Sequence, residues 1–121
     1  MITRVEAICL LVSNLISSRD YYENKLGLTV SLTDTGFVEY KLGDTPLAIF
    51  ERKHATAMFP SKFMSRPGGA VIALKVSDVH KLCKNLEEKG VTPFEGPKKV
   101  PWGQTVAYIH DPDGHIIELT D

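Results

Sequence analysis

An internal repeat is the feature that most constrains the fold of this chain. Val12-Ser13-Asn14-Leu15 in the first half matches Val76-Ser77-Asp78-Val79 in the second. Gly27-Leu28-Thr29 matches Gly90-Val91-Thr92 at nearly the same spacing. A repeat on this scale indicates that one supersecondary unit occurs twice. The structure that the first half forms should therefore be formed again by the second half.

Each half begins with an apolar segment followed by a capped helix. Residues 2–12 are rich in Val, Ile and Leu, which is typical of a buried strand. Asn14 is a favourable N-cap residue and Gly27 a favourable helix terminator. The second half repeats this order with a strand at 70–76 and an apolar helical stripe that ends before Gly90. Turn residues then separate three predicted strands in each half, at residues 28–33, 37–42 and 47–52 and at residues 91–94, 104–110 and 116–120.

Each half therefore predicts a βαβββ module, and the fold class is α+β. The modules cover about residues 1–52 and 70–121, with a connector at 53–69. In this alignment Tyr40 corresponds to Tyr108. Two such modules side by side are expected to form one curved mixed sheet, with a cleft inside and the helices on the outer face. A length of 121 residues fits a single domain.

Charge and hydropathy exclude several classes of protein. The net charge is -1 and the basic residues are spread along the chain, which argues against a nucleic-acid-binding protein. The apolar run Ala7–Val12 is much shorter than the roughly 20 residues that span a bilayer. It is also too short for a signal peptide, so we expect a cytoplasmic protein without a membrane partner. Cys9 and Cys83 are expected to be free thiols.

Two motifs make the resemblance to a known family specific. Tyr21-Tyr22 followed by Leu26-Gly27, and Asp111-Pro112-Asp113-Gly114-His115 followed by Ile116-Ile117-Glu118-Leu119, resemble signatures of the vicinal oxygen chelate superfamily. That superfamily includes glyoxalases, bleomycin resistance proteins and extradiol dioxygenases. The resemblance covers the whole chain except the connector. It implies a small-molecule cleft and a homodimer, with modules paired within one chain or exchanged between two.

The same resemblance implies four positions for the ligands of a divalent metal. These positions fall on Ala7, Ile49, Val71 and Glu118. Three of the four carry hydrocarbon, whereas transition metals in proteins generally take three or more protein ligands. The sequence therefore predicts no metal and no other cofactor. The alternative is a divalent metal held weakly by Glu118 and Glu51.

Strand parity predicts which side chains line the cleft. The expected cleft face consists of Ala7, Cys9, Leu11, Leu47, Ile49, Glu51, Val106, Tyr108, Ile116 and Glu118. Tyr108 and Glu118 share this face only if the last turn uses all five residues 111–115. Tyr108 would donate a hydrogen bond and Glu118 would accept one. Glu118 needs a partner inside an apolar cleft, namely Tyr108, water or a cationic ligand.

Loop residues complete the predicted ligand-binding set, which is Cys9, Ile49, Glu51, Phe59, Trp102, Tyr108 and Glu118. Trp102 either stacks on a flat ligand or closes the edge of the sheet. The connector, which carries Phe59, forms either a lid over the cleft or a dimer contact. Cys9 is either a structural thiol or a nucleophile, and no cationic neighbour is evident to activate it.

These residues predict a metal-independent binding protein of the bleomycin-resistance type. Its partner would be a small organic ligand, aromatic or cationic, held in the sheet cleft of a homodimer. The alternative is a metal-dependent lyase or dioxygenase of the glyoxalase type. A third possibility is metal-free acid–base catalysis by Glu51, Glu118 and Tyr108.

Overall fold

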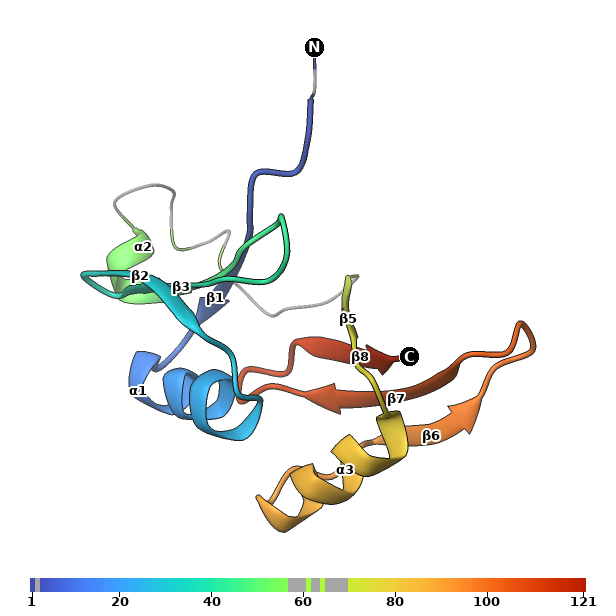
Figure 1. Cartoon of the computed structure of the whole chain (residues 1–121). Helices are drawn as coiled ribbons and strands as arrows, with labels where there is room; N and C mark the ends of the chain where they lie inside the picture. The colour runs from blue at the N-terminus through green and yellow to red at the C-terminus, as the bar shows by residue number, and fades with distance from the viewer. Residues whose placement is uncertain (2, 57–60, 62–63, 65–69) are drawn as a thin grey trace. The chain divides into compact units, whose positions relative to one another are not determined.

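The first half of the chain folds as a four-stranded mixed sheet with its helix on one face. The computed structural model describes residues 1, 3–56, 61, 64 and 70–121. Strands β1 (Ile8–Val12), β2 (Val30–Asp34), β3 (Phe37–Tyr40) and β4 (Leu47–Glu51) lie in the order β1-β4-β3-β2 (Figure 1). β1 runs parallel to β4, whereas β3 is antiparallel to both of its neighbours.

The helix between β1 and β2 begins where the sequence predicts. The Asn14 side chain accepts a hydrogen bond from the Ser17 backbone N–H at 3.0 Å and so caps α1 (Leu15–Arg19). The helix then continues as the π-helical segment η1 (Asp20–Lys25), where a regular α-helix was expected. The wider π turn brings the consecutive residues Tyr21 and Tyr22 closer to one side of the helix, and both are buried.

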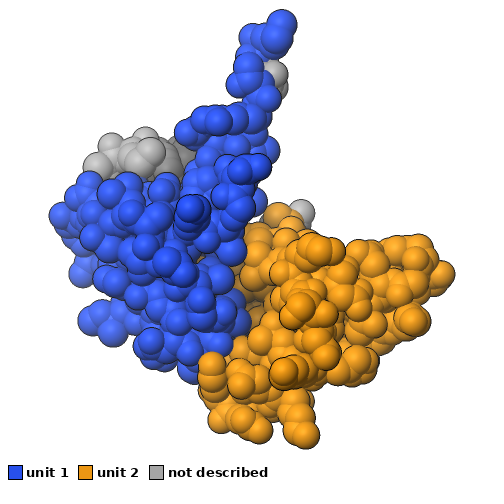
Figure 2. Space-filling model, viewed as in Figure 1, with its two compact units in different colours: residues 1–66 blue, residues 67–121 orange. Residues whose placement is uncertain are grey.

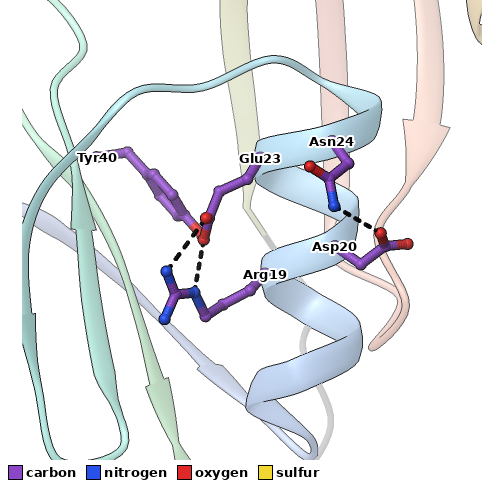
Figure 3. A network of polar contacts seen from close by, with 5 residues as sticks. All are labelled: Arg19, Asp20, Glu23, Asn24 and Tyr40. Atoms are coloured by element: carbon purple, nitrogen blue, oxygen red, sulfur yellow. Dashed lines mark hydrogen bonds and ion pairs between the residues drawn. The ribbon is translucent and has the colours of Figure 1, made fainter.

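The helix packs on the face of the sheet that carries Tyr40. The Tyr22 and Tyr40 rings lie 5.9 Å apart between centroids. Figure 3 shows Arg19 and Tyr40 converging on Glu23, whose Oε2 accepts hydrogen bonds from Arg19 Nε at 2.7 Å and from the Tyr40 hydroxyl at 2.9 Å. Burial, followed by this hydrogen bond, raises the pKa of Tyr40. The phenol is therefore a stable donor that ties β3 to the helix. On the adjacent strand, Ile49 shares this face and is fully buried.

The second half repeats the arrangement. Strands β5 (Val71–Lys75), β6 (Glu95–Lys99), β7 (Thr105–His110) and β8 (Ile116–Thr120) lie in the order β5-β8-β7-β6, with β5 parallel to β8. Helix α3 (Val79–Glu88) begins at Asp78, whose side chain accepts from the Lys81 backbone N–H at 3.1 Å. It buries the predicted apolar stripe Val79, Cys83 and Leu86.

One strand lies elsewhere than predicted. The sequence placed a strand at residues 91–94, but β6 covers Glu95–Lys99. This segment contains Gly96 and Pro97 and has low intrinsic strand propensity. β6 is the edge strand of its sheet, where a proline without an N–H is tolerated. The position of β6 is therefore determined by its pairing with β7, in which Glu95 lies opposite Tyr108, and not by local strand propensity.

Two βαβββ modules are thus confirmed. They correspond to two compact units, residues 1–66 and residues 67–121, which Figure 2 distinguishes by colour. A short helix, α2 (Arg52–Ala55), follows β4 at the start of the predicted connector. The joining of both sheets into one curved sheet stays a prediction. Within the described residues, we find no helix with the length and hydropathy needed to cross a membrane.

Candidate ligand-binding site

Tyr108 and Glu118 face each other on neighbouring strands of the second unit. They are directly opposite in the antiparallel β7–β8 ladder. The Tyr108 hydroxyl donates a hydrogen bond to Glu118 Oε1 at 2.7 Å. The turn uses residues 111–115, so the condition for a shared face is met. The predicted pairing of these two side chains is confirmed.

Asp111 fixes the length of that turn. Its Oδ1 accepts hydrogen bonds from the backbone N–H groups of Asp113 at 3.0 Å and His115 at 2.8 Å. Its Oδ2 lies 2.7 Å from His115 Nδ1. Asp111 is only 4% exposed, so these bonds are shielded from water. A carboxylate that bonds to backbone N–H groups two and four residues ahead stabilises a tight turn, and here it sets the register of β7 and β8.

Two further aromatic side chains accompany the Tyr108–Glu118 pair. The Phe94 ring stacks on the His110 imidazole, with centroids 4.0 Å apart and planes 11° apart. It also lies 6.1 Å from the Tyr108 ring. We call Phe94, Tyr108, His110 and Glu118 the Tyr108 face. Phe94 is nevertheless 50% exposed.

Phe94 was not among the predicted site residues, because the sequence pattern there predicts only the end of a strand. The Phe94 backbone N–H instead donates to the Tyr108 carbonyl at 2.9 Å, just before β6 begins. That hydrogen bond places Phe94 beside β7. The ladder between β6 and β7 is irregular after Glu95. Alternation of side chains along the segment therefore gives no reliable signal for Phe94.

The phenol of Tyr108 is held in its neutral form. The hydrogen bond to Glu118 raises the pKa of Tyr108, and desolvation and the negative charges of Glu118 and Glu95 act in the same direction. Losing the proton would break the hydrogen bond and place a phenolate beside a carboxylate. Tyr108 is therefore a persistent hydrogen-bond donor at neutral pH.

This arrangement predicts a measurable titration. Glu118→Gln removes the negative charge beside the phenol, so the pKa of Tyr108 should fall back toward the ordinary value of about 10. Ultraviolet absorbance of tyrosinate, with Tyr108→Phe subtracted to isolate this residue, measures the shift. An unchanged Tyr108 titration in Glu118→Gln would show that the hydrogen bond is not formed in solution.

The first unit corrects part of the predicted cleft face. In the parallel β1–β4 ladder, Cys9 lies beside Ala48, and Leu10 lies beside Ile49. Ile49 therefore points to the opposite side of the sheet from Cys9, into the core under the helix. Leu47 and Glu51 share the parity of Ile49, so they leave the predicted face as well. Three consecutive buried residues, Leu47 to Ile49, give β4 no alternation from which its parity can be read.

Glu51 has a structural role at the start of α1. Its Oε2 accepts a hydrogen bond from the Leu15 backbone N–H at 2.8 Å, and its Oε1 lies 3.4 Å from Lys53 Nζ and 3.6 Å from His54 Nε2. The first N–H groups of a helix lack partners within the helix. Glu51, at the end of the neighbouring strand β4, supplies the missing acceptor for one of these N–H groups. This hydrogen bond is the main reason that the pKa of Glu51 is lowered.

The lowered pKa gives a pH-dependent contribution to stability. A carboxylate with a depressed folded-state pKa stabilises the fold above its unfolded pKa, and this contribution is lost as pH falls through the folded value. Wild type should therefore exceed Glu51→Gln in urea midpoint at pH 7, and the difference should shrink by pH 3. Glu6→Gln, at a side chain that is 80% exposed, is the control with no such difference. A gap between wild type and Glu51→Gln that stays constant from pH 7 to pH 3 would contradict this role.

The remaining predicted site residues are found in different settings. Trp102 is 76% exposed. Its Nε1–H donates to Gln104 Oε1 at 2.9 Å, and Gln104 in turn donates to the Asp121 carbonyl at 3.3 Å. Cys9 is exposed as a residue, yet desolvation of its thiol raises the pKa of Cys9, which is opposite to nucleophile activation. Phe59 lies outside the described residues.

The strand ladders also test the predicted metal positions. Glu118 lies beside Ala73 on β5. The repeat aligns Val12 with Val76, so Cys9 and Ala73, each three residues earlier, occupy equivalent positions. Cys9 lies beside Ala48 in the β1–β4 ladder. Ala48 is therefore the counterpart of Glu118 in the first unit. The predicted position Ile49 is thus corrected to Ala48, which has no donor either. Within the described part of each unit, no three His, Cys, Asp or Glu side chains gather as ligands. These residues do not fit a divalent metal.

Comparisons with known proteins agree with this architecture. The family model described as a glyoxalase-like domain matches residues 5–121. The uncharacterized protein YraH of Bacillus subtilis (strain 168) is 32% identical over 93% of each chain. A probable lactoylglutathione lyase of Synechocystis is 31% identical over 88% of this chain and 74% of its own length. The crystal structure of TnmS3, an antibiotic binding protein from a Streptomyces species, superposes with a TM-score of 0.77 at 30% identity and covers 98% of this chain and 94% of that one. The chain therefore belongs to the glyoxalase-like domain family of the glyoxalase, bleomycin resistance and dioxygenase superfamily.

Proposed function

We propose that this protein binds a small aromatic or cationic organic molecule at the Tyr108 face and needs no metal to do so. The observation that carries the proposal is the hydrogen-bonded pair Tyr108–Glu118 beside the stacked rings of Phe94 and His110. Flat rings offer stacking surface, and Glu118 offers negative charge and a second oxygen. The ring of Phe94 is half-exposed and so is accessible to a ligand.

Two further considerations support binding over metal catalysis. The sequence has alanine or valine at three of the four positions that correspond to metal ligands, and a single carboxylate is not a transition-metal site. The similar structure TnmS3 is described as an antibiotic binding protein. The function proposed here is of the same kind, namely sequestration of an organic molecule as in bleomycin resistance proteins.

Titration with proflavine, a planar organic cation, tests the proposal. Chelator-treated protein should bind the dye in calorimetry, and Glu118→Gln should weaken binding at least about tenfold, which corresponds to about 1.4 kcal/mol. Tyr108→Phe should weaken it less, because the carboxylate remains. Glu6→Gln is the matched control. Equal affinities for wild type, Glu118→Gln and Glu6→Gln would overturn the assignment to this face.

Trp102 is proposed as a further contact in the same experiment. Its indole is exposed and is held by the hydrogen bond to Gln104. A ligand that stacks on this ring should change the tryptophan emission, and Trp102 is the single tryptophan of the chain. Emission that does not change when calorimetry shows binding would place the ligand away from Trp102.

The alternative function is a metal-dependent lyase or dioxygenase of the glyoxalase type. The similarity to a probable lactoylglutathione lyase favours it. Glu118 would have to leave Tyr108 and find donors from elsewhere, and Glu51 is engaged at the start of α1. For the same reason, Glu51 is a poor candidate for the acid–base catalysis considered from the sequence. Isomerisation of a glutathione hemithioacetal to the corresponding thioester that depends on added nickel or zinc would support the alternative.

We also propose that the protein is a homodimer and acts in the cytoplasm. The dimer is proposed from the family resemblance, and the location from the sequence, which has no long apolar segment. Light scattering coupled to size-exclusion chromatography should give about twice the chain mass of 13.4 kDa. A monomer across the micromolar range would remove the dimer from the proposal.

A further inference from the structure

Two side chains of opposite charge, Lys75 and Glu118, lie on the same side of the sheet in the second unit. Glu118 lies beside Ala73 in the parallel β5–β8 ladder. Lys75 lies beside Thr120, two residues farther along both strands. Neighbouring residues in a ladder point to the same side of a sheet, as do residues two apart along a strand. Lys75 therefore lies on the side of the sheet that carries the Tyr108 face.

From this geometry we infer that the ligand of the Tyr108 face is an aromatic zwitterion, such as an aromatic amino acid. Its ammonium group would contact Glu118 and its carboxylate would contact Lys75. The inference rests on the proposed function and deepens it by naming the class of ligand. It assigns to Lys75 the selection of ligands that carry both charges.

The exposure of β5 agrees with this orientation of Lys75. The strand alternates between exposed and half-buried residues, and Val71, Ala73 and Lys75 are the exposed ones. Residues two apart on a strand are separated by about 7 Å. Ala73, which lies beside Glu118 and two residues before Lys75, has only a methyl group as its side chain. A small ligand can therefore reach both charged groups.

Both charges lack an ion-pair partner among the described residues. Glu118 accepts a hydrogen bond from the Tyr108 hydroxyl at 2.7 Å, but the neutral phenol does not cancel the charge of the carboxylate. Glu95, the carboxylate opposite Tyr108 on β6, is paired with Lys98, whose Nζ lies 3.4 Å from Glu95 Oε1. No such contact joins Lys75 or Glu118 to a cation or an anion in the part of the second unit that the structure describes.

This distribution of charge favours a ligand that carries both signs. An ammonium group is attracted to Glu118 and repelled by Lys75, and the reverse holds for a carboxylate. A simple cation or anion therefore gains from one residue and loses at the other, whereas a zwitterion gains at both. The rings of Phe94 and Tyr108, with centroids 6.1 Å apart, add an aromatic surface beside Glu118.

The first unit indicates that the fold does not require this pair of charges. The repeat that aligns Val12 with Val76 places Leu11 at the position of Lys75. Ala48 stands at the position of Glu118. The first unit forms a sheet with the same strand order and with hydrocarbon at both positions. The two charges are therefore available for recognition of a ligand.

The ladders also correct the predicted alignment of Tyr40 with Tyr108. Glu39 lies opposite Ala48, as Tyr108 lies opposite Glu118, so Glu39 is the counterpart of Tyr108. Tyr40 instead lies on the face that the helix covers. The hydrogen-bonded tyrosine and glutamate are thus a feature of the second unit that the repeat does not impose.

Three related compounds test the inference on the full-length protein: phenylalanine, phenethylamine, which lacks the carboxylate, and 3-phenylpropionate, which lacks the amine. Dissociation constants from nitrogen–proton correlation spectra should be lowest for phenylalanine. Lys75→Met should weaken phenylalanine binding about threefold to fivefold, as expected for loss of an exposed ion pair, and should not weaken phenethylamine binding. Glu118→Gln should weaken the binding of both amines. Lys99→Met removes a lysine from the opposite side of the same sheet and should change neither affinity.

The other outcomes separate the inference from the proposed function. Equal affinity of wild type and Lys75→Met for phenylalanine would overturn the inference, as would phenylalanine that binds no better than phenethylamine. If phenethylamine binding still depends on Glu118 in that case, the proposed function stands. Binding of both amines that is insensitive to Glu118→Gln would overturn the proposed function together with the inference. Thermal melts establish that each variant is folded.

Discussion

Replacing Ile49 with alanine is expected to lower the free energy of unfolding by about 2–5 kcal/mol. Ile49 has an exposed fraction of 0% and lies beside Leu10 on β1 and Val38 on β3. Its side chain lies on the face of the sheet that carries Tyr40 and on which the helix packs. Removing it leaves a cavity that the surrounding strands and helix can close only in part. Urea denaturation followed by circular dichroism measures the change.

Ile16→Ala is the matched control, because it makes the same chemical change on α1 at a residue that is 83% exposed. Its effect should stay within about 0.5 kcal/mol. The comparison tests the orientation of β4 directly. If Ile49 faced a ligand cleft, Ile49→Ala would change ligand affinity and cost little stability. A loss below about 1 kcal/mol would contradict the β1–β4 register.

The second large effect is expected at Asp111. Asp111→Ala leaves the buried N–H groups of Asp113 and His115 without their acceptor. Each unsatisfied buried donor costs about 1–3 kcal/mol, so the loss of both acceptor contacts should cost about 2–6 kcal/mol. The substitution should also loosen the register of β7 and β8. The pKa of Tyr108 should therefore move toward its ordinary value in the same variant.

Two controls separate the contributions of Asp111. Asp111→Asn keeps an oxygen for the two backbone donors and changes the contact with His115, so its effect should be smaller than that of Asp111→Ala. Asp44→Ala removes an exposed aspartate from another turn and should change stability by no more than about 0.5 kcal/mol. Equal losses for Asp111→Ala and Asp44→Ala would show that the 111–115 turn does not depend on the buried carboxylate.

The parts of the fold that were predictable from sequence depend on local chemistry. Asn14 and Asp78 cap their helices because a side-chain oxygen three residues before a backbone N–H needs no distant partner. Gly27 takes a φ of 74° at the helix end, which L-residues with a side chain rarely adopt. The Asp111 turn is equally local. The shared face of Tyr108 and Glu118 was predicted on the condition that the turn uses residues 111–115, and that register came from the family resemblance.

The errors concern features that only tertiary pairing decides. The orientation of β4 follows from its parallel ladder with β1. The sequence between the two strands does not indicate the register of that ladder. Glu51 reads as a cleft carboxylate in sequence because its partner, the Leu15 N–H, is 36 residues away. Phe94 and β6 are positioned by β7 across an irregular ladder. The error in the β4 register does not change the prediction about metal ligands, because Ala48 and Ile49 both lack donor atoms in their side chains.

Elemental analysis of the purified protein, paired with thermal melts, distinguishes metal-free binding from metal-dependent catalysis. Alanine and valine stand where metal donors would be needed, and Glu118 is engaged with Tyr108. Well under one transition metal per chain is expected, with no rise in melting temperature on adding nickel, zinc or manganese. One bound metal per chain, lost together with its thermal stabilisation in Glu118→Gln, would contradict metal-free binding.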